Sequence, residues 1–381
     1  MKVGILTFHR ASNYGTSLQA FATAKILQNL GVDAEIIDYR PDYIEKTLET
    51  RRIRDAKDIK AFASIIINKA VYGGQLQRKI SNFLTFINTM PVSKTVCRNL
   101  DEVKKAAAVY DIILSGSDQL WNDKITGSDL TYFIPFDHSR KVSYASSFGV
   151  AEISSQRQEE IRPYLSSFDF ITVREKKAIE LVSKVLQDSA YSEHKIRRVV
   201  DPTLLICQDE WIMISNPDIQ LPSSGYILTY YMIETPILRA ITKRIRKETG
   251  LPIVNLKPSK KQVLFHDGLN LMWAGPRELL KCYSGARFVV TNSFHGTAFA
   301  INYNVPMYVA PLPVSMAGEV NSRLVDLLDW YGLSDRWIHS LETVDKMQIS
   351  DLPEELSELK TVRREESISV LKKMIEGKEY E

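Results

Sequence analysis

At 381 residues, the chain is longer than a single hydrophobic core usually serves, so two domains are expected. Its 44% of hydrophobic and 25% of charged residues are ordinary for a globular protein, and a net charge of +3 is too small to indicate nucleic-acid binding. No stretch approaches the roughly 18 apolar residues that a membrane-spanning helix needs. The apolar run at residues 3–8 is too short for a signal peptide, so we expect a cytoplasmic protein.

The cysteines and histidines do not have the spacing of a disulfide framework or a metal centre. Cys97, Cys207 and Cys282 are odd in number and widely separated, and none lies in a C-x-x-C pair. The six histidines likewise lack the spacing of metal ligands. We therefore expect neither a metal ion nor a bound cofactor.

The first part of the chain has the pattern of a parallel α/β domain. Residues 2–8 predict a buried strand, residues 17–30 an amphipathic helix, and residues 34–39 a second strand. Such a unit closes right-handed and generates a parallel sheet. Further strands are predicted at residues 110–115, 141–146, 168–173 and 198–200. Because Pro202 ends regular structure after the last of them, we expect the first domain to span residues 1–206.

The same alternation returns in residues 207–350 and predicts a second Rossmann-like domain. Its predicted strands are residues 226–231, 252–256, 287–291 and 306–310. Its predicted helices are residues 235–249, 276–284, a segment that begins near residue 295, and residues 321–331. The fold class is therefore α/β, with two Rossmann-like domains and a cleft between them.

Two stretches fall outside this alternation. Residues 42–105 are mixed in charge and compatible with helix, so we expect a helical insertion that packs on the first domain. The alternative is that this insertion contacts the inner face of a membrane and approaches a lipid-linked substrate, through apolar residues at 62–67 and basic residues at 51–60. Residues 351–381 predict a charged C-terminal helix that packs back on the N-terminal domain.

The loops that follow the predicted strands are informative, because ligands of open parallel sheets bind beyond the carboxyl ends of the strands. The loop at residues 9–17 lacks the G-x-G-x-x-G pattern, which argues against a nicotinamide or flavin cofactor. It offers Asn13 and Thr16 at a helix N-terminus, where free N–H groups and the helix dipole attract an anion or a hydroxyl-rich ligand. Ser117 and Asp118 follow a later strand in the same way.

A loop of the second domain contains the strongest candidates for residues of the functional site. Ser293 and Thr297 stand where a helix begins, and their hydroxyls suit a phosphate. His295 lies between them, and with an ordinary pKa of about 6.5 it suits proton transfer. Arg174 leaves a strand of the first domain toward the same cleft and is the candidate for a fixed cation, and Lys257 follows a strand of the second domain.

Several of these segments together resemble the polysaccharide pyruvyl transferase family. The matching segments are NYGTSLQA (13–20), GSDQLWN (116–122), SYASSFG (143–149), VRE (173–175), DPTLL (201–205), TNSFHGTAFAINYNVP (291–306) and NSR (321–323). As an ordered set, these segments are a specific indication of the family, whereas each segment alone is a weak indication. The resemblance implies two domains arranged as in the GT-B glycosyltransferases.

The resemblance also implies a reaction. Family members are expected to transfer pyruvate from phosphoenolpyruvate to two hydroxyls of a sugar, or of a lipid-linked oligosaccharide, and so to form a cyclic ketal in cell-surface polysaccharides. Carried over by motif, His295 is the general acid and Arg174 binds phosphoenolpyruvate. The substrate-binding residues expected from the loops and the matching segments are Asn13, Gly15, Thr16, Gln19, Ser117, Asp118, Lys257, Ser293, Gly296, Thr297 and Arg323.

One position departs from the family pattern. Characterised members resemble Arg-Leu-His where this chain has serine, phenylalanine and histidine at 293–295. The missing guanidinium removes a charged hydrogen bond, worth about 1.5–3 kcal/mol, and Arg323 or Lys257 is the candidate to replace its charge. Two alternatives stay open: a nucleotide-sugar glycosyltransferase of the same architecture, and a homologue that has kept the fold and lost the chemistry.

Overall fold

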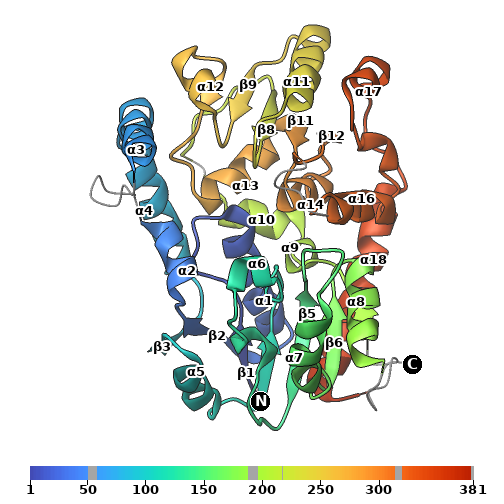
Figure 1. Ribbon diagram of the computed structural model, residues 1–381. Coiled ribbons are helices and arrows are strands. Elements are labelled where there is room, and N and C mark those ends of the chain that lie inside the picture. The colour runs from blue at the N-terminus through green and yellow to red at the C-terminus, as the bar shows by residue number, and fades with distance from the viewer. Residues whose placement is uncertain (50–57, 188–195, 217, 314–319, 379–381) are drawn as a thin grey trace.

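The protein contains two parallel β-sheets of the α/β class, and one sheet lies below the other in Figure 1. The computed structural model describes residues 1–49, 58–187, 196–216, 218–313 and 320–378. The first sheet has seven strands in the order β3-β2-β1-β4-β5-β6-β7, and the second has five in the order β10-β9-β8-β11-β12. Neighbouring strands are parallel throughout both sheets. The predicted α/β class with two Rossmann-like sheets is therefore confirmed.

The central strands of the first sheet are buried along their whole length, as parallel strands covered by helices on both faces should be. The strands are β1 (Lys2–Leu6), β2 (Asp33–Tyr39), β3 (Val92–Cys97), β4 (Ile112–Ser115), β5 (Lys141–Ser146), β6 (Phe170–Val173) and β7 (Ile196–Arg198). The helices that connect them include α1 (Tyr14–Asn29), α5 (Leu100–Ala107), α6 (Asp123–Thr126), α7 (Ser155–Leu165) and α8 (Lys176–Leu186).

The second sheet follows the short helices α9 (Pro202–Leu205) and α10 (Gln208–Ile214). Its strands are β8 (Tyr226–Tyr230), β9 (Ile253–Asn255), β10 (Leu269–Asn270), β11 (Ala286–Thr291) and β12 (Met307–Val309). Its helices are α11 (Pro236–Thr249), α12 (Lys260–Leu264), α13 (Pro276–Ser284), α14 (Phe294–Asn302), α16 (Val320–Trp330) and α17 (Leu341–Lys346). Helices α11 and α13 both begin with proline, whose missing N–H and fixed φ suit the first helical position.

Both sheets are wound in the same way. The order of the chain reverses between β1 and β4 in the first sheet and between β8 and β11 in the second. In open parallel sheets, ligands bind outside the carboxyl ends of the strands at this reversal. The loops after β1, β4, β8 and β11 are therefore the expected site.

A continuous hydrophobic core joins the two domains. Buried residues of α1, β4, β8 and α14 belong to one cluster. Across the junction, the hydroxyl of Tyr14 donates to the carbonyl of Ala274 at 2.8 Å, and its ring meets that of Tyr230 edge-on with centroids 5.5 Å apart. Trp211 lies between Phe21 and Phe299. These contacts hold the carboxyl ends of the two sheets close together.

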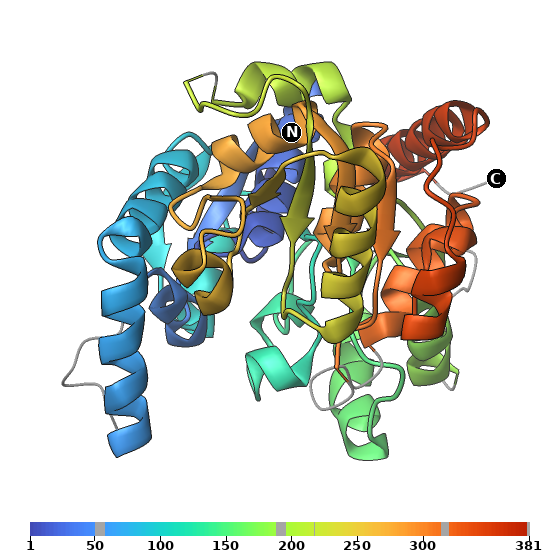
Figure 2. The same cartoon turned by 90° about the horizontal axis from the view of Figure 1, so that it is seen from above.

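Two helices on one side of the molecule, α3 (Ile59–Tyr72) and α4 (Gln75–Ile87), form what we call the helical arm (Figures 1 and 2). Helix α4 buries Phe83, Phe86 and Ile87. Its Asn82 donates a hydrogen bond to the carbonyl of Trp273 in the second domain. Helix α3 extends away from the body of the molecule and exposes apolar side chains. They are Phe62, Ile66 and Ile67.

The expectation of a helical insertion over residues 42–105 was wrong at its C-terminal end. After α2 (Asp42–Glu45), the 3-10 helix at Lys46–Leu48 and the helical arm, the chain forms strand β3, which pairs with β2 at the edge of the first sheet. This strand reads as polar because most of its side chains are not buried. The expected membrane contact of the arm stays a prediction, and its basic residues at 51–57 lie outside the described part of the chain.

The C-terminal helix α18 (Leu356–Glu376) contacts both domains. From the first domain, Arg140 donates to the carbonyls of Met374 and Ile375, and the N–H of Val200 donates to Ser367 Oγ at 3.0 Å. From the second domain, Asn302 accepts from Lys360 through its carbonyl at 2.9 Å. Within the described ranges, none of the helices is both long and apolar enough to span a bilayer.

Candidate active site

The loops at the two chain reversals enclose a pocket of about 130 Å³ between the domains. The first domain contributes Asn13, Asp118, Gln119 and Arg174, and the second contributes Met232, Asn292, Ser293, Phe294, His295, Leu312, Arg323 and Leu324. This volume is well below the roughly 300–1,000 Å³ of sites for drug-sized ligands, so the pocket suits a small metabolite.

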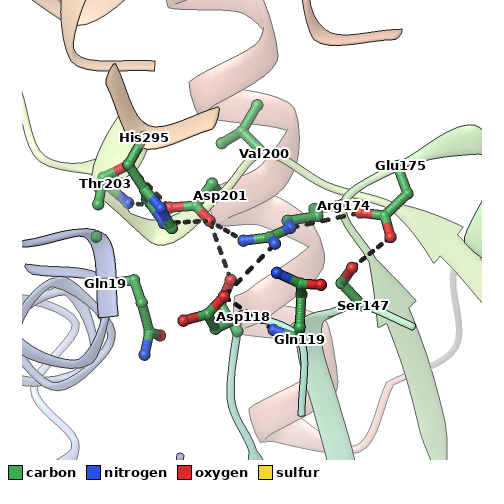
Figure 3. A network of polar contacts seen from close by, with 12 residues as sticks. Gln19, Asp118, Gln119, Ser147, Arg174, Glu175, Val200, Asp201, Thr203 and His295 are labelled. Carbon is green, nitrogen blue, oxygen red and sulfur yellow. Dashed lines mark hydrogen bonds and ion pairs between the residues drawn. The ribbon is translucent and has the colours of Figure 1, made fainter. Parts of the chain in front are cut away.

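Arg174 lies at the centre of a buried charge network (Figure 3). Its Nη1 donates to Asp201 Oδ2 at 2.9 Å, and its Nη2 lies 3.7 Å from Asp118 Oδ1. Its Nε lies 3.4 Å from Glu175 Oε2. Burial acts to lower the pKa of Arg174, but the three carboxylates raise that pKa above its usual value. The guanidinium is therefore a fixed positive charge.

Asp201 connects Arg174 to His295. It follows the last strand of the first sheet and caps α9, where its Oδ1 accepts from the N–H and the hydroxyl of Thr203 at 3.0 and 2.8 Å. Its Oδ2 accepts from Ser117 Oγ at 3.1 Å and lies 3.5 Å from His295 Nε2. Burial acts to raise the pKa of Asp201, but the neighbouring cations and N–H group hold that pKa below its usual range. The carboxylate is therefore ionised.

His295 lies in the first turn of α14, held between the two domains. Ser293 begins this helix, and its Oγ accepts the N–H of Gly296 at 3.2 Å. On one side of the imidazole is Asp201, and on the other is Gly15, where a Cβ would lie only 1.9 Å from Nδ1. The ring is thus fixed against the first turn of α1 while it lines the pocket.

Arg323, on α16, is the second guanidinium of the pocket. It is 6% exposed, and among the described residues it has no ion pair or hydrogen bond. Its guanidinium carbon lies 5.9 Å from the centre of the Phe294 ring, and that of Arg174 lies 4.4 Å from the same ring. Burial and the nearby charge of Arg174 lower the pKa of Arg323 to about 10, and the carboxylates of Glu175 and Asp118 offset this effect only in part. A buried cation without a counter-ion is costly, which is typical of an anion-binding site.

Asp118 and the start of α1 form the opposite wall. Asp118 adopts a left-handed φ of 80°, which is uncommon outside glycine and often marks a functional loop. Its carboxylate accepts from Thr16 Oγ1 at 2.8 Å and from the N–H of Gln119 at 2.9 Å. Burial acts to raise the pKa of Asp118, but the charges of Arg174 and His295 lower that pKa.

A family model of the polysaccharide pyruvyl transferases matches residues 13–310, well over half of the chain. The chain belongs to the polysaccharide pyruvyl transferase family. The matched range contains Arg174, Asp201 and His295. No curated protein matches the sequence significantly.

Solved structures similar to this member of the family share its fold. UDP-GlcNAc 2-epimerase from Neisseria meningitidis, bound to UDP-GlcNAc, has a TM-score of 0.52 at 9% identity, with 99% of each chain covered. The UDP-GlcNAc 2-epimerase from Methanocaldococcus jannaschii has a TM-score of 0.51 at 12% identity and 91% coverage of each chain. Medicago truncatula UGT71G1, complexed with UDP-glucose, has a TM-score of 0.50 at 12% identity, covering 99% of this chain and 98% of its own. The expected GT-B-like architecture is confirmed, and at these identities the likeness concerns the fold alone.

The structure brings together most of the residues expected to form the pyruvyl transferase site. The pocket is lined by six of them, Asn13, Asp118, Arg174, Ser293, His295 and Arg323. Five more of the expected residues lie behind this lining and support it: Gly15, Thr16, Gln19, Ser117 and Gly296. The roles expected for these residues stay predictions.

Two further expected residues do not line the pocket either. The Thr297 hydroxyl is fully buried and donates to the carbonyl of Ser293 at 3.1 Å, so it faces its own helix. Lys257 is exposed, and its Nζ donates to the carbonyl of Met232 at 3.0 Å. Arg323, rather than Lys257, is therefore the second positive charge that lines the pocket together with Arg174.

Some residues of the site were not expected from the sequence. From the sequence, Asp201 was recognised only as part of the DPTLL segment and was given no role in the site. Its position directly after the last strand of the first sheet could have indicated that it belongs to the site. Asn292 fixes the loop after β8, since it accepts from the N–H of Met232 and donates to the carbonyl of Ile233, both at 2.8 Å. Glu175, held by Ser147 Oγ, completes the cage around Arg174 (Figure 3).

Proposed function

We propose that this protein transfers pyruvate from phosphoenolpyruvate to two hydroxyls of an acceptor sugar, forming a cyclic ketal in polysaccharide biosynthesis. The observation that carries the proposal is the position of Arg323, a buried guanidinium without a described counter-ion in the same small pocket as His295 and Arg174. Phosphoenolpyruvate carries a carboxylate and a phosphate, which are the groups that arginine binds best.

The electrostatics of the pocket support a small anionic donor. Asp201 does not line the pocket, and its oxygens are occupied by internal hydrogen bonds. Asp118 has both oxygens engaged as well. Arg174 keeps Nη2 without a hydrogen bond, and Arg323 keeps Nε without one. Together with the N-terminus of α14, these groups favour negative charge.

In the first chemical step, the oxygen of one sugar hydroxyl forms a bond to C2 of phosphoenolpyruvate, and the C3 methylene takes up a proton to become a methyl group. His295 is the proton donor in this proposal, because it lines the pocket while Asp201 stabilises its imidazolium form. The proton that leaves the hydroxyl restores the imidazolium. Asp201 is a positioning residue, since it acts through His295 and Arg174.

In the second step, the oxygen of the second hydroxyl forms a bond to the same C2 atom, and the bond from C2 to the phosphate oxygen breaks. Inorganic phosphate leaves with the second hydroxyl proton, and the cyclic ketal is complete. Arg323 and Arg174 stabilise the charge that builds on the departing phosphate. The step needs no oxidant, reductant or further co-reactant.

Acceptor-dependent phosphate release tests the proposal. Wild-type protein is mixed with phosphoenolpyruvate and a panel of free, nucleotide-linked and lipid-linked sugars, and phosphate is measured together with the mass of the product. The proposal expects a product heavier by one pyruvyl ketal group, and none with His295→Ala. Binding of nucleotide sugars with no binding of phosphoenolpyruvate would instead support the glycosyltransferase alternative. Unchanged function of His295→Ala in cells would support a homologue without catalysis.

A further inference from the structure

A larger groove lies outside the pocket just described, between the helical arm and the loop after β1. Its volume is about 920 Å³. Most polar side chains on its walls are hydroxyls and amides, the groups that hydrogen-bond sugars, and two lysines and the carboxylate of Glu49 accompany them. Ser12, Ser64, Asn68, Gln77, Lys69 and Lys79 are among the lining residues.

Lys79 is a buried cation that faces this groove from α4. Its side chain is 9% exposed, and its Nζ lies 5.0 Å from the centre of the Tyr14 ring and 5.8 Å from that of Phe83. Among the described residues, no carboxylate or hydrogen-bond acceptor pairs with this ammonium. Burial lowers the pKa of Lys79 to about 8. The ring contacts compensate only part of the lost hydration.

A second lysine approaches Lys79 from the other domain. Lys257, in the loop after β9, precedes Pro258, whose carbonyl accepts from the Tyr72 hydroxyl of the arm at 3.3 Å. Lys257 does not itself line the groove, but its positive charge acts on Lys79 and lowers the pKa of Lys79 further. Its Nζ donates to the carbonyl of Met232, and no carboxylate of the described chain pairs with it. Two like charges from opposite domains repel, and an anion between them would stabilise both.

Four consecutive residues link this groove to the pocket. Ser12 lines the groove and Asn13 lines the pocket. The next residue, Tyr14, places its ring beside Lys79, and Gly15 lies against the imidazole of His295. A molecule that extends along this loop would therefore reach from the lysine pair to the proposed general acid.

We infer that Lys79 and Lys257 bind a phosphate group carried by the acceptor sugar, and that the sugar occupies the groove beside the helical arm. The inference rests on the proposed function, because it makes the groove the acceptor side and the pocket the donor side. Such a phosphate occurs in sugars linked to a nucleoside diphosphate and in sugars linked to a lipid diphosphate. Both sources share the chemistry that two lysines recognise.

Calorimetric titration with inorganic pyrophosphate tests the lysine pair. Wild-type protein is expected to bind it, and Lys79→Met and Lys257→Met are each expected to weaken binding by about tenfold, since each removes one charged contact. Lys79→Arg keeps the charge and should retain most of the affinity. Lys243→Met, which removes an exposed lysine of α11, is the matched control and should bind like the wild type. UDP and farnesyl diphosphate then identify the source, since the one that binds more tightly than pyrophosphate carries the correct attached group.

Two outcomes would overturn the inference. The first is that the wild type does not bind pyrophosphate. The second is that Arg323→Met abolishes binding while Lys79→Met and Lys257→Met leave it unchanged. In that case the anion would occupy the donor pocket. Failure of the proposed function gives a different result. Pyrophosphate would still bind through the two lysines, but phosphoenolpyruvate would release no phosphate with any acceptor.

Discussion

The imidazole of His295 occupies the space that any side chain at Gly15 would need. A Cβ at Gly15 would lie 1.9 Å from Nδ1 and 2.3 Å from Cγ of the ring. Gly15 belongs to the first turn of α1 in the first domain, and His295 to the first turn of α14 in the second. The glycine is therefore required for close packing across the domain junction rather than for a left-handed backbone.

Replacing Gly15 with alanine should displace the imidazole. We expect Gly15→Ala to lower pyruvyl transfer by about 100-fold, the scale of a misplaced general acid. Overpacking should also lower the free energy of unfolding by about 1–3 kcal/mol. Steady-state kinetics and urea denaturation measure the two effects.

A double variant separates this contact from a general effect on α1. Once His295→Ala has removed the ring, adding Gly15→Ala should not change the free energy of unfolding appreciably. If Gly15→Ala costs as much in the absence of the ring as in its presence, the contact does not position the histidine.

Arg323→Met should weaken binding and strengthen the fold at the same time. The side chain is buried next to Arg174 and forms no described ion pair or hydrogen bond, so its loss removes a charge that the nearby carboxylates offset only in part. We expect the free energy of unfolding to rise by about 1 kcal/mol or more. The dissociation constant for phosphoenolpyruvate should rise at least tenfold, the value of one charged hydrogen bond.

Calorimetry and thermal denaturation measure these two opposite effects. Arg239→Met, which removes an arginine of α11 whose side chain is 53% exposed, is the matched control and should leave both quantities near those of the wild type. A destabilised Arg323→Met protein would show that the guanidinium has a structural partner, and unchanged affinity would remove it from the donor site.

Asp201→Asn should separate catalysis from donor binding. The substitution keeps the shape but removes the charge that stabilises an imidazolium at His295, so kcat should fall by about 100-fold. Arg174 loses a counter-charge and keeps two others, so KM for phosphoenolpyruvate should not rise. Thr203→Val leaves the charge in place and removes a hydrogen bond to it, and it should have nearly normal kcat. A rise in KM with unchanged kcat would contradict the positioning role.

Much of the fold was predictable because buried parallel strands and amphipathic helices leave strong patterns. The predicted strand at 141–146 and helix at 276–284 have the bounds of β5 and α13. Strand β3 was missed since it lies at the edge of the sheet, where Lys94 and Thr95 are exposed, and an exposed edge strand lacks the apolar run of a central one.

The site was predictable only in part. The rule that ligands bind at the carboxyl ends of strands placed Arg174 and His295 at one cleft, and both line the pocket. The same rule could not show that Asp201, 27 residues after Arg174, would lie between them, because that depends on how the two sheets pack. Nor could it show that Arg323 lacks a partner, because pairing is a tertiary property.

The buried ammonium of Lys79 should make stability depend on pH in a specific direction. The pKa of Lys79 is about 8 in the folded protein against the usual 10.5, so the unfolded chain binds the proton more tightly. The cost of burying the charge is fully present below pH 8 and disappears as the pH rises through 10.5. Lys79→Met has no such cost. We therefore expect it to be more stable than the wild type below pH 8, by about 3 kcal/mol.

Urea denaturation of both proteins between pH 7 and pH 10.5 measures this difference, which should shrink steadily as the pH rises above about 8. Other titrating groups are common to the two proteins and largely cancel in the comparison. The free energy of unfolding of Lys243→Met should change with pH in the same way as that of the wild type, since the Lys243 side chain is exposed. Pyrophosphate should stabilise the wild type near neutral pH and so reduce the same gap, because a bound anion neutralises the buried charge. A gap that is independent of pH would mean that Lys79 keeps an ordinary pKa, and a gap of opposite sign would mean that its charge already has a partner in the fold.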